Sequence, residues 1–243
     1  MMNMNDNNLL LKIKKELRRL ASKEKAKNLQ RFFKTGKDEY AEGDKFLGVM
    51  VPQTRLLVKK YWTQISLANT KILLTSKFHE ERLLALLILV KKFEKGDEIQ
   101  RKEIFDLYLA NTKHINNWDL VDLSSPKIVG AYLEDKDKSI LLKLAKSKSL
   151  WERRVAMLAT FWFIGKGKSE YALKIAAMLI DDKEDLIHKA VGWALREIGK
   201  RCGQEIEEEF LRRHYQTMPR TTLRYAIERF NEAKRQAYLT GEI

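Results

Sequence analysis

Apolar residues recur at helical spacing along most of the chain, and no segment alternates as a β-strand does. Residues 8–35 predict a pair of amphipathic helices, and residues 36–51, with three glycines, predict a loop with short turns. Further helices, separated by short loops, are predicted over residues 52–62, 70–77, 80–95, 97–110, 117–123, 126–133, 138–146, 150–164, 169–180, 184–202, 205–216 and 221–237. The pattern therefore predicts an all-α protein.

Five of these helices carry a related apolar pattern at an almost constant interval. It begins at Arg82, Trp118, Arg154, Lys189 and Arg224, which are 36, 36, 35 and 35 residues apart. Such a period is typical of an α-solenoid, in which each repeat buries its apolar face against its neighbours. We predict a single HEAT-like domain over residues 1–243, with basic helices and a loop at 1–51 and stacked helical repeats at 52–243.

The register of the repeat indicates where function lies. Four of the five leading residues are cations, which predicts a positive stripe along a concave groove. Four residues further on, the repeats carry Leu86, Asp122, Leu158, Trp193 and Glu228. Asp122 and Trp193 depart from leucine at this position, as does Glu228 in the terminal repeat. A carboxylate in a groove that attracts polyanions weakens binding, so chemistry explains Asp122 better than binding does.

Composition and charge narrow the classes of partner. The 243 residues carry a formal charge of +14, which indicates a polyanion and favours nucleic acid over an acidic membrane surface. Eleven cations face only Glu16 and Glu24 between Lys12 and Lys37, a run that is either a solvated face or, as we favour, a set of phosphate contacts. The longest apolar run, residues 83–90, is too short to cross a membrane.

The single cysteine, Cys202, forms no internal disulfide, and the four histidines are widely scattered. No metal site is predicted from this distribution. The single cysteine and the lack of an apolar signal segment lead us to expect a cytoplasmic protein.

Trp118 and Asp122 form the most informative pair in the sequence. They are four residues apart on a short predicted helix with Asn116 or Asn117 as its N-cap, so both side chains share one helix face. An indole and a carboxylate can therefore face the same point in space. The alternative is a partly buried tryptophan beside a solvated aspartate. We interpret Trp62, Trp151 and Trp162 as packing residues.

Three segments resemble a known family: residues 118–122 (WDLVD), residues 151–154 (WERR) and residues 189–197 (KAVGWALRE). They are similar to the AlkD family of bacterial DNA alkylation repair proteins, which are HEAT-like repeat glycosylases. The resemblance extends to residues 218–220 and 223–225. It implies excision of cationic N3- or N7-alkylated purines from duplex DNA without metal or organic cofactor, and without flipping of the base into a pocket.

The resemblance also assigns roles to residues. Asp122 is the expected catalytic carboxylate, and Trp118 and Trp193 are the expected aromatic walls. Residues expected to contact DNA are Arg154, Lys189, Arg196 and Phe32. Phe32 stands where the family often has a tyrosine, so its ring is retained and any hydrogen bond through a hydroxyl is lost.

Three functions remain open at this point. An alkylpurine DNA glycosylase, acting as a monomer in base excision repair in the bacterial cytoplasm near the nucleoid, accounts for Asp122, both tryptophans and Arg154 together. A noncatalytic repeat protein that binds damaged or branched DNA accounts for the charge and leaves Asp122 unexplained. A protein-binding HEAT scaffold accounts for neither.

Overall fold

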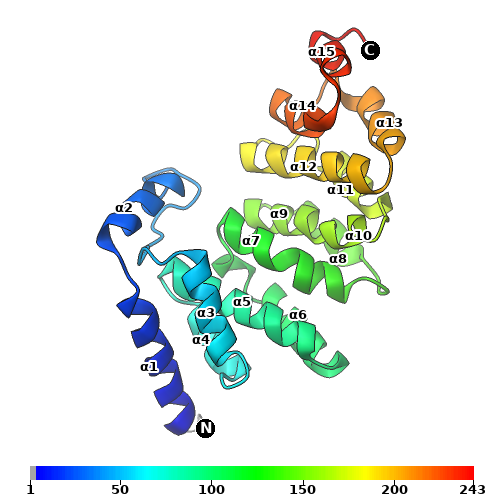
Figure 1. Cartoon of the computed structure of the whole chain (residues 1–243). Helices are drawn as coiled ribbons and strands as arrows, with labels where there is room; N and C mark the ends of the chain where they lie inside the picture. Colours follow the sequence, from blue (N-terminus) through cyan, green and yellow to red (C-terminus); the bar gives the residue numbers. More distant parts are fainter. Residues whose placement is uncertain (1–3) are drawn as a thin grey trace. The chain divides into compact units, whose positions relative to one another are not determined.

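A computed structural model describes the backbone of residues 4–243 and the side chains from residue 7 onward. It is all-α, as predicted, and contains no strand in this range; Lys45 and Phe78 form an isolated β-bridge (Figure 1). No helix in the described range combines the length and the apolar character needed to span a membrane. The helices divide between two compact units, residues 1–128 and 129–243. The single repeat domain stays a prediction.

The N-terminal unit contains α1 (Met4–Arg19), α2 (Lys23–Phe32), α3 (Val51–Tyr61), α4 (Leu67–Leu74), α5 (His79–Lys95), α6 (Glu98–Leu109), η1 (Thr112–His114) and α7 (Trp118–Ser125). The π-helix η2 (Pro126–Gly130) follows α7 directly. The C-terminal unit contains α8 (Ser139–Ala145), α9 (Leu150–Ala159), α10 (Phe161–Ile164), α11 (Glu170–Met178), α12 (Asp185–Arg201), α13 (Gln204–His214), α14 (Arg220–Ala226), η3 (Ile227–Arg229) and α15 (Glu232–Thr240).

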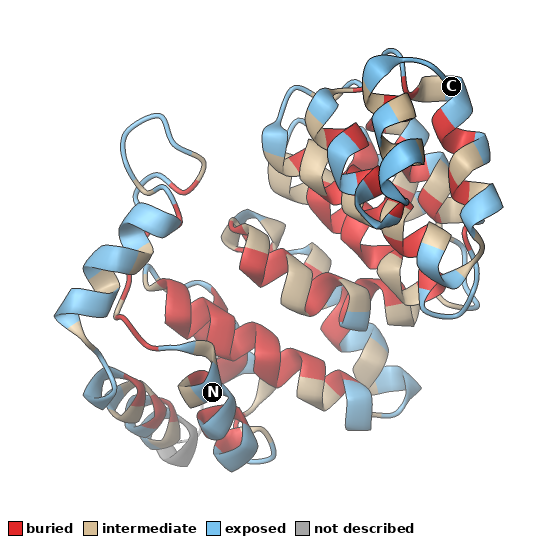
Figure 2. Ribbon diagram, turned by 45° about the horizontal axis from the view of Figure 1, so that its top comes forward, coloured by how far each residue is buried: buried red, intermediate tan, exposed pale blue. Residues whose placement is uncertain are grey.

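Helix α5 is the centre of the N-terminal unit. Residues 79–90 are all buried (Figure 2), and the helix packs against α3, α4, α6 and α7. A helix that is apolar on every side is stable only when other elements surround it. Its first turn buries charged groups as well, and these bind neighbouring segments: Glu81 pairs with Lys14 and Arg18 of α1.

The basic amphipathic pair at the N-terminus is confirmed as α1 and α2. Ile13 and Leu17 of α1 are fully buried, whereas α2 has no buried residue. Every cation from Lys12 to Lys37 is exposed except Lys14, which is half-buried. These helices therefore present a strongly positive surface to solvent.

Several predicted helices differ from the structure. The predicted helices at 117–123 and 126–133 are not separated by a loop, because α7 passes directly into the π-helix η2. Helix α4 begins three residues earlier than predicted because Ser66 caps it, accepting a hydrogen bond from the Asn69 backbone. Residues 150–164 form two helices that meet at Thr160 rather than one. Residues 221–237 also divide, because Asn231 caps α15 through the Lys234 backbone. Serine and asparagine are both preferred at the N-cap of a helix, because their side chains accept hydrogen bonds from the first turn.

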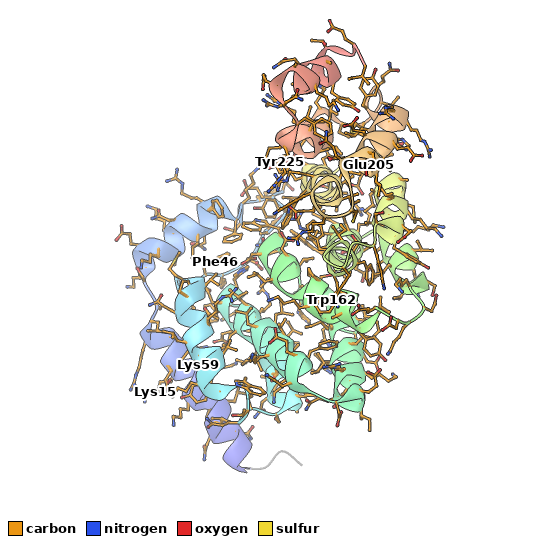
Figure 3. The ribbon with its side chains drawn as sticks, turned by 45° about the vertical axis from the view of Figure 1, so that its right-hand side comes forward. Lys15, Phe46, Lys59, Trp162, Glu205 and Tyr225 are labelled. Carbon is orange, nitrogen blue, oxygen red and sulfur yellow. The ribbon has the colours of Figure 1, made fainter. Side chains whose placement is uncertain are left out.

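Helix α12 is the centre of the C-terminal unit and packs against α9, α11, α13 and α14. Gly192 allows its close approach to α14: a Cβ there would collide with the Thr222 carbonyl oxygen and lie 2.5 Å from Cβ of Tyr225, a residue labelled in Figure 3. The absence of a side chain at Gly192 therefore allows α12 and α14 to pack closely.

We expect Gly192→Ala to destabilise the protein by about 1–3 kcal/mol, because the added methyl group forces two helices apart. Urea denaturation followed by far-UV circular dichroism measures the change. Gly165→Ala is the matched control, since Gly165 is exposed, has φ −59° and offers a new Cβ at least 3.3 Å from its neighbours. An equal loss of unfolding free energy in the two variants would contradict the proposed close contact.

Candidate functional site

Helix α7 positions Trp118 and Asp122. The buried Asn117 is its N-cap, and its side-chain oxygen accepts a hydrogen bond of 2.8 Å from the Trp118 backbone. Leu120 and Val121 face the core with no exposed surface, while Trp118 and Asp122 are both half-buried. The helical spacing places these two side chains one turn apart on the partly exposed side of α7.

Phe32 and Trp118, which are far apart in sequence, lie side by side. Their ring centroids are 5.9 Å apart with an interplanar angle of 72°, and Phe32 is 64% exposed. Below them, the buried Phe33 stacks on Trp118 at 5.1 Å and on Phe46 at 5.2 Å. The structure thus forms an aromatic surface at the start of α7 from two predicted residues and two that were not predicted, of which Phe46 is labelled in Figure 3.

A buried ionic cluster lies beneath this aromatic surface. Nε2 of His79 lies 2.8 Å from a carboxylate oxygen of Asp119, and Nδ1 lies 3.5 Å from Asp44. Arg82 donates to the same Asp44 oxygen at 2.7 Å. Two carboxylates therefore alternate with a guanidinium and an imidazole, an arrangement that is electrically neutral when His79 is protonated.

The cluster shifts the pKa of both of its central groups. Burial alone lowers the pKa of His79, but the charge and hydrogen bond of Asp119, assisted by Asp44, raise it above the ordinary value. Burial raises the pKa of Asp44, and the opposing effects of His79 and Arg82 bring it below its usual range. The imidazolium form of His79 is thus stabilised by the fold.

The expected stripe of exposed cations is wrong at Arg82. This side chain is 3% exposed, pairs with Asp44 and donates to the Ser76 carbonyl at 3.0 Å. A buried guanidinium is stable only with such partners. Its role is to hold the loop before α3 against the start of α5. The nearby Glu80 has a similar role, because its carboxylate accepts three backbone N–H groups from residues 47–49.

Asp119 anchors α7 to α5. One oxygen accepts the hydrogen bond of His79, and the other accepts from the Leu120 backbone at 2.8 Å. Since Trp118 precedes it and Asp122 follows one turn later, this anchor fixes the orientation of both. Asp122 lies close enough to Tyr108 of α6 for its negative charge to add to the effect of burial, which raises the pKa of that phenol.

We expect Asp119→Asn to lower the free energy of unfolding by about 1.5–3 kcal/mol, because it removes a charge-assisted hydrogen bond to His79. The raised pKa of His79 means that the stabilisation is present at acid pH and is lost as the pH rises through that pKa. The difference between variant and wild type should therefore be largest near about pH 6 and shrink in alkali. Urea titrations across this range measure it, and a difference that grows in alkali would contradict the ion pair.

In the C-terminal unit, Lys189, Trp193 and Arg196 share one face of α12, at successive turns. Trp193 is half-buried and meets Phe161 edge-on at 4.6 Å. Lys189 pairs with Asp185 at 2.6 Å, and Arg196 pairs with Glu228. The unit therefore places these three predicted residues together, with both cations held by acids.

Arg154 lies deeper than expected. It is 4% exposed, and its guanidinium donates to the Leu186 carbonyl at 2.5 Å, which ties α9 to α12. The surface stripe is thus wrong at this position as well, and a phosphate contact by Arg154 stays a prediction. Tyr225, which was not predicted as a site residue, is 37% exposed and packs beside Gly192.

No group of three or more His, Cys, Asp or Glu residues within the described range is arranged to hold a metal ion. The carboxylates of Asp44 and Asp119 are instead bound by Arg82, His79 and the Leu120 backbone N–H group.

Comparison with known proteins places this geometry in a family. The family described as DNA alkylation repair enzyme matches residues 13–230, which is most of the chain. This chain belongs to the DNA alkylation repair enzyme family. The resemblance seen in the sequence is therefore confirmed, and the matched range contains the aromatic surface, the His79 cluster and the Trp193 face of α12.

A solved structure of the family has the same fold. It is named as a predicted DNA alkylation repair enzyme from Enterococcus faecalis, is 17% identical and superposes with a TM-score of 0.67. The match covers 87% of this chain and 97% of the other. A search of curated proteins gave no match. At this identity the solved structure supports the fold alone.

Proposed function

We propose that this member of the DNA alkylation repair family is a DNA glycosylase that hydrolyses the N-glycosidic bond of cationic N3- or N7-alkylated purines in duplex DNA. The observation that carries the proposal is the grouping of Phe32 and Trp118 at the start of α7, with Asp122 one turn further on. Aromatic faces attract a cationic base by about 0.5–2 kcal/mol each, and a carboxylate stabilises positive charge on the sugar.

The reaction does not require a strong general acid. An alkylated purine already carries positive charge, so the electrons of the breaking bond between C1′ and the base neutralise it as it leaves. Water adds to C1′, forming the new C–O bond, and releases one proton to the surrounding solvent. Asp122 opposes the positive charge that develops on the sugar and orients the water. The residues that supply this chemistry are all part of the protein, so the proposal includes no metal or cofactor.

DNA binding is assigned to the exposed cations of α1 and α2, with Lys189, Arg196 and Phe32 as further contacts and Arg154 as a backbone contact. Of these, the N-terminal helices have the clearest support, because their cations are exposed. Affinity for undamaged duplex should therefore fall steeply with salt. The proposed partner is alkylated duplex DNA, bound by a monomer in the cytoplasm near the nucleoid.

The test is release of free base from duplex DNA that contains N7-methylguanine, followed by chromatography. Release by wild type at a rate well above spontaneous depurination supports the glycosylase. A noncatalytic DNA-binding role is the second candidate, favoured by the exposed cations of α1 and α2, which explain affinity for DNA without any chemistry. Salt-sensitive DNA binding without base release would establish it in place of the enzyme.

A further inference from the structure

A pocket in the N-terminal unit is independent of the residues assigned above. It lies between α3 and the second half of α5, has a volume of about 330 Å³ and is completed by Lys127 of η2. Lys127 stands five residues after Asp122 on the continuation of α7 into η2, so a single helical segment contributes to both places.

The inner wall of the pocket is apolar and aromatic. Val58, Leu87 and Val90 show small exposed fractions of 8%, 8% and 5%, and Trp62 is half-buried beside them. Among the described residues, the Trp62 ring stacks on no other aromatic group and its indole N–H has no hydrogen-bond acceptor. A packing tryptophan usually satisfies this N–H, so Trp62 offers a ring face and a donor to a ligand.

The rim of the pocket is positive. Arg55, Lys59, Lys91 and Lys127 face a single acid, Glu94, which leaves a formal charge of +3. Glu94 pairs with Lys91 at 3.1 Å, whereas Arg55, Lys59 and Lys127 are exposed and form no ion pair within the described part of the chain. Figure 3 labels Lys59 on α3. Three cations are thus available to an anion.

We propose that this pocket binds a nucleotide, with its base against Trp62 and its phosphate on the rim formed by Arg55, Lys59 and Lys127. A planar heterocycle joined to a phosphate is the chemical class that satisfies both an aromatic wall and a cationic rim, as in proteins that bind single-stranded nucleic acid. The nucleotide comes either from an unpaired stretch of DNA or from the free pool. This inference rests on the proposed function in one respect only: that function makes DNA the expected source of the nucleotide.

The first test measures affinity for a short fluorescein-labelled oligothymidylate by fluorescence anisotropy. Trp62→Ala should weaken binding roughly fivefold or more, the effect of losing one base–aromatic stack, and Trp62→Phe should restore most of it. Loss in Trp62→Ala without recovery in Trp62→Phe would count against stacking. Circular dichroism verifies that each variant is folded.

The second test separates the pocket from the general charge of the protein. The double variant Lys59→Glu, Lys127→Glu changes the net charge as much as the control Lys143→Glu, Lys174→Glu, whose lysines are exposed on α8 and α11. The pocket variant should lose several times more affinity than the control. Equal losses would overturn the proposal.

Competition identifies the source of the nucleotide. Displacement of the oligonucleotide by thymidine monophosphate, and by neither thymidine nor inorganic phosphate, would indicate a free nucleotide. Binding of the oligonucleotide alone, still dependent on Trp62, would indicate the DNA strand. Displacement by inorganic phosphate as readily as by the monophosphate would overturn the role of Trp62. Base release by wild type is measured separately, so failure of the glycosylase and failure of this pocket give different results.

Discussion

Asp122→Asn should excise N7-methylguanine roughly a hundred- to thousandfold more slowly than wild type, the usual loss when one preorganised electrostatic stabiliser is removed. The amide keeps the shape of the side chain and removes its charge. In a protein with a net charge of +14, loss of a negative group should leave DNA affinity unchanged or raise it. The excision rate should therefore fall without a loss of DNA affinity. Single-turnover excision with saturating protein isolates the chemical step.

The matched comparison is Asp119→Asn, three residues earlier on α7. Asp119 is buried against His79, so its loss should appear mainly as lower stability, whereas Asp122 is half-buried and its loss should leave stability largely intact. Were Asp122→Asn to excise within about threefold of wild type, Asp122 would not be the catalytic carboxylate and Asp119 would be the next candidate.

Glu207→Gln should stabilise the protein at neutral and alkaline pH by about 3–5 kcal/mol. Glu207 of α13 is 3% exposed, its Oε1 has no hydrogen-bond partner, and it lies against Gly199 of α12. Burial, reinforced by the charge of Glu208 and opposed by Arg196, raises its pKa from 4.5 to about 8. The fold therefore holds a carboxyl group that resists ionisation.

The sign of the effect follows from proton binding. Below pH 4.5 the folded and unfolded chains both hold the proton, and the glutamine variant gains nothing. Between pH 4.5 and about 8 the unfolded chain releases it while the folded chain retains it, so wild-type stability falls as the pH rises. A neutral glutamine avoids this loss.

Urea denaturation at acid, neutral and alkaline pH measures the gain of Glu207→Gln. Glu205→Gln is the control, because Glu205 is exposed on the same helix and is labelled in Figure 3; it should alter stability little at any pH. A gain for Glu207→Gln that is independent of pH would mean that the carboxyl group ionises normally.

Local patterns in the sequence were sufficient to predict the fold class and the geometry of α7. The spacing of Trp118 and Asp122, and Asn117 as a cap, are properties of one short segment, and the structure retains them. The basic N-terminal helices follow from composition in the same way. The roles of these residues in catalysis and DNA binding stay predictions, because geometry alone does not test chemistry.

Long-range pairing was beyond what the sequence could provide. Arg82 has the same register as Trp118, but its partner Asp44 is 38 residues away in a loop that has no regular pattern. His79 stands alone in the sequence, and Asp119, which binds it, is 40 residues further on. Burial of such charges depends on tertiary contacts. The periodicity of the sequence therefore predicts correctly that these residues lie on helices, but predicts incorrectly that they are exposed.

The exposure of Phe32 has a consequence for how easily its side chain can change. Its ring is 64% exposed, and its aromatic contacts are with Phe33 and Trp118. Because most of this residue is exposed, exchange between phenylalanine and tyrosine should cost the fold little. This position can therefore exchange phenylalanine and tyrosine without a compensating change elsewhere in the fold.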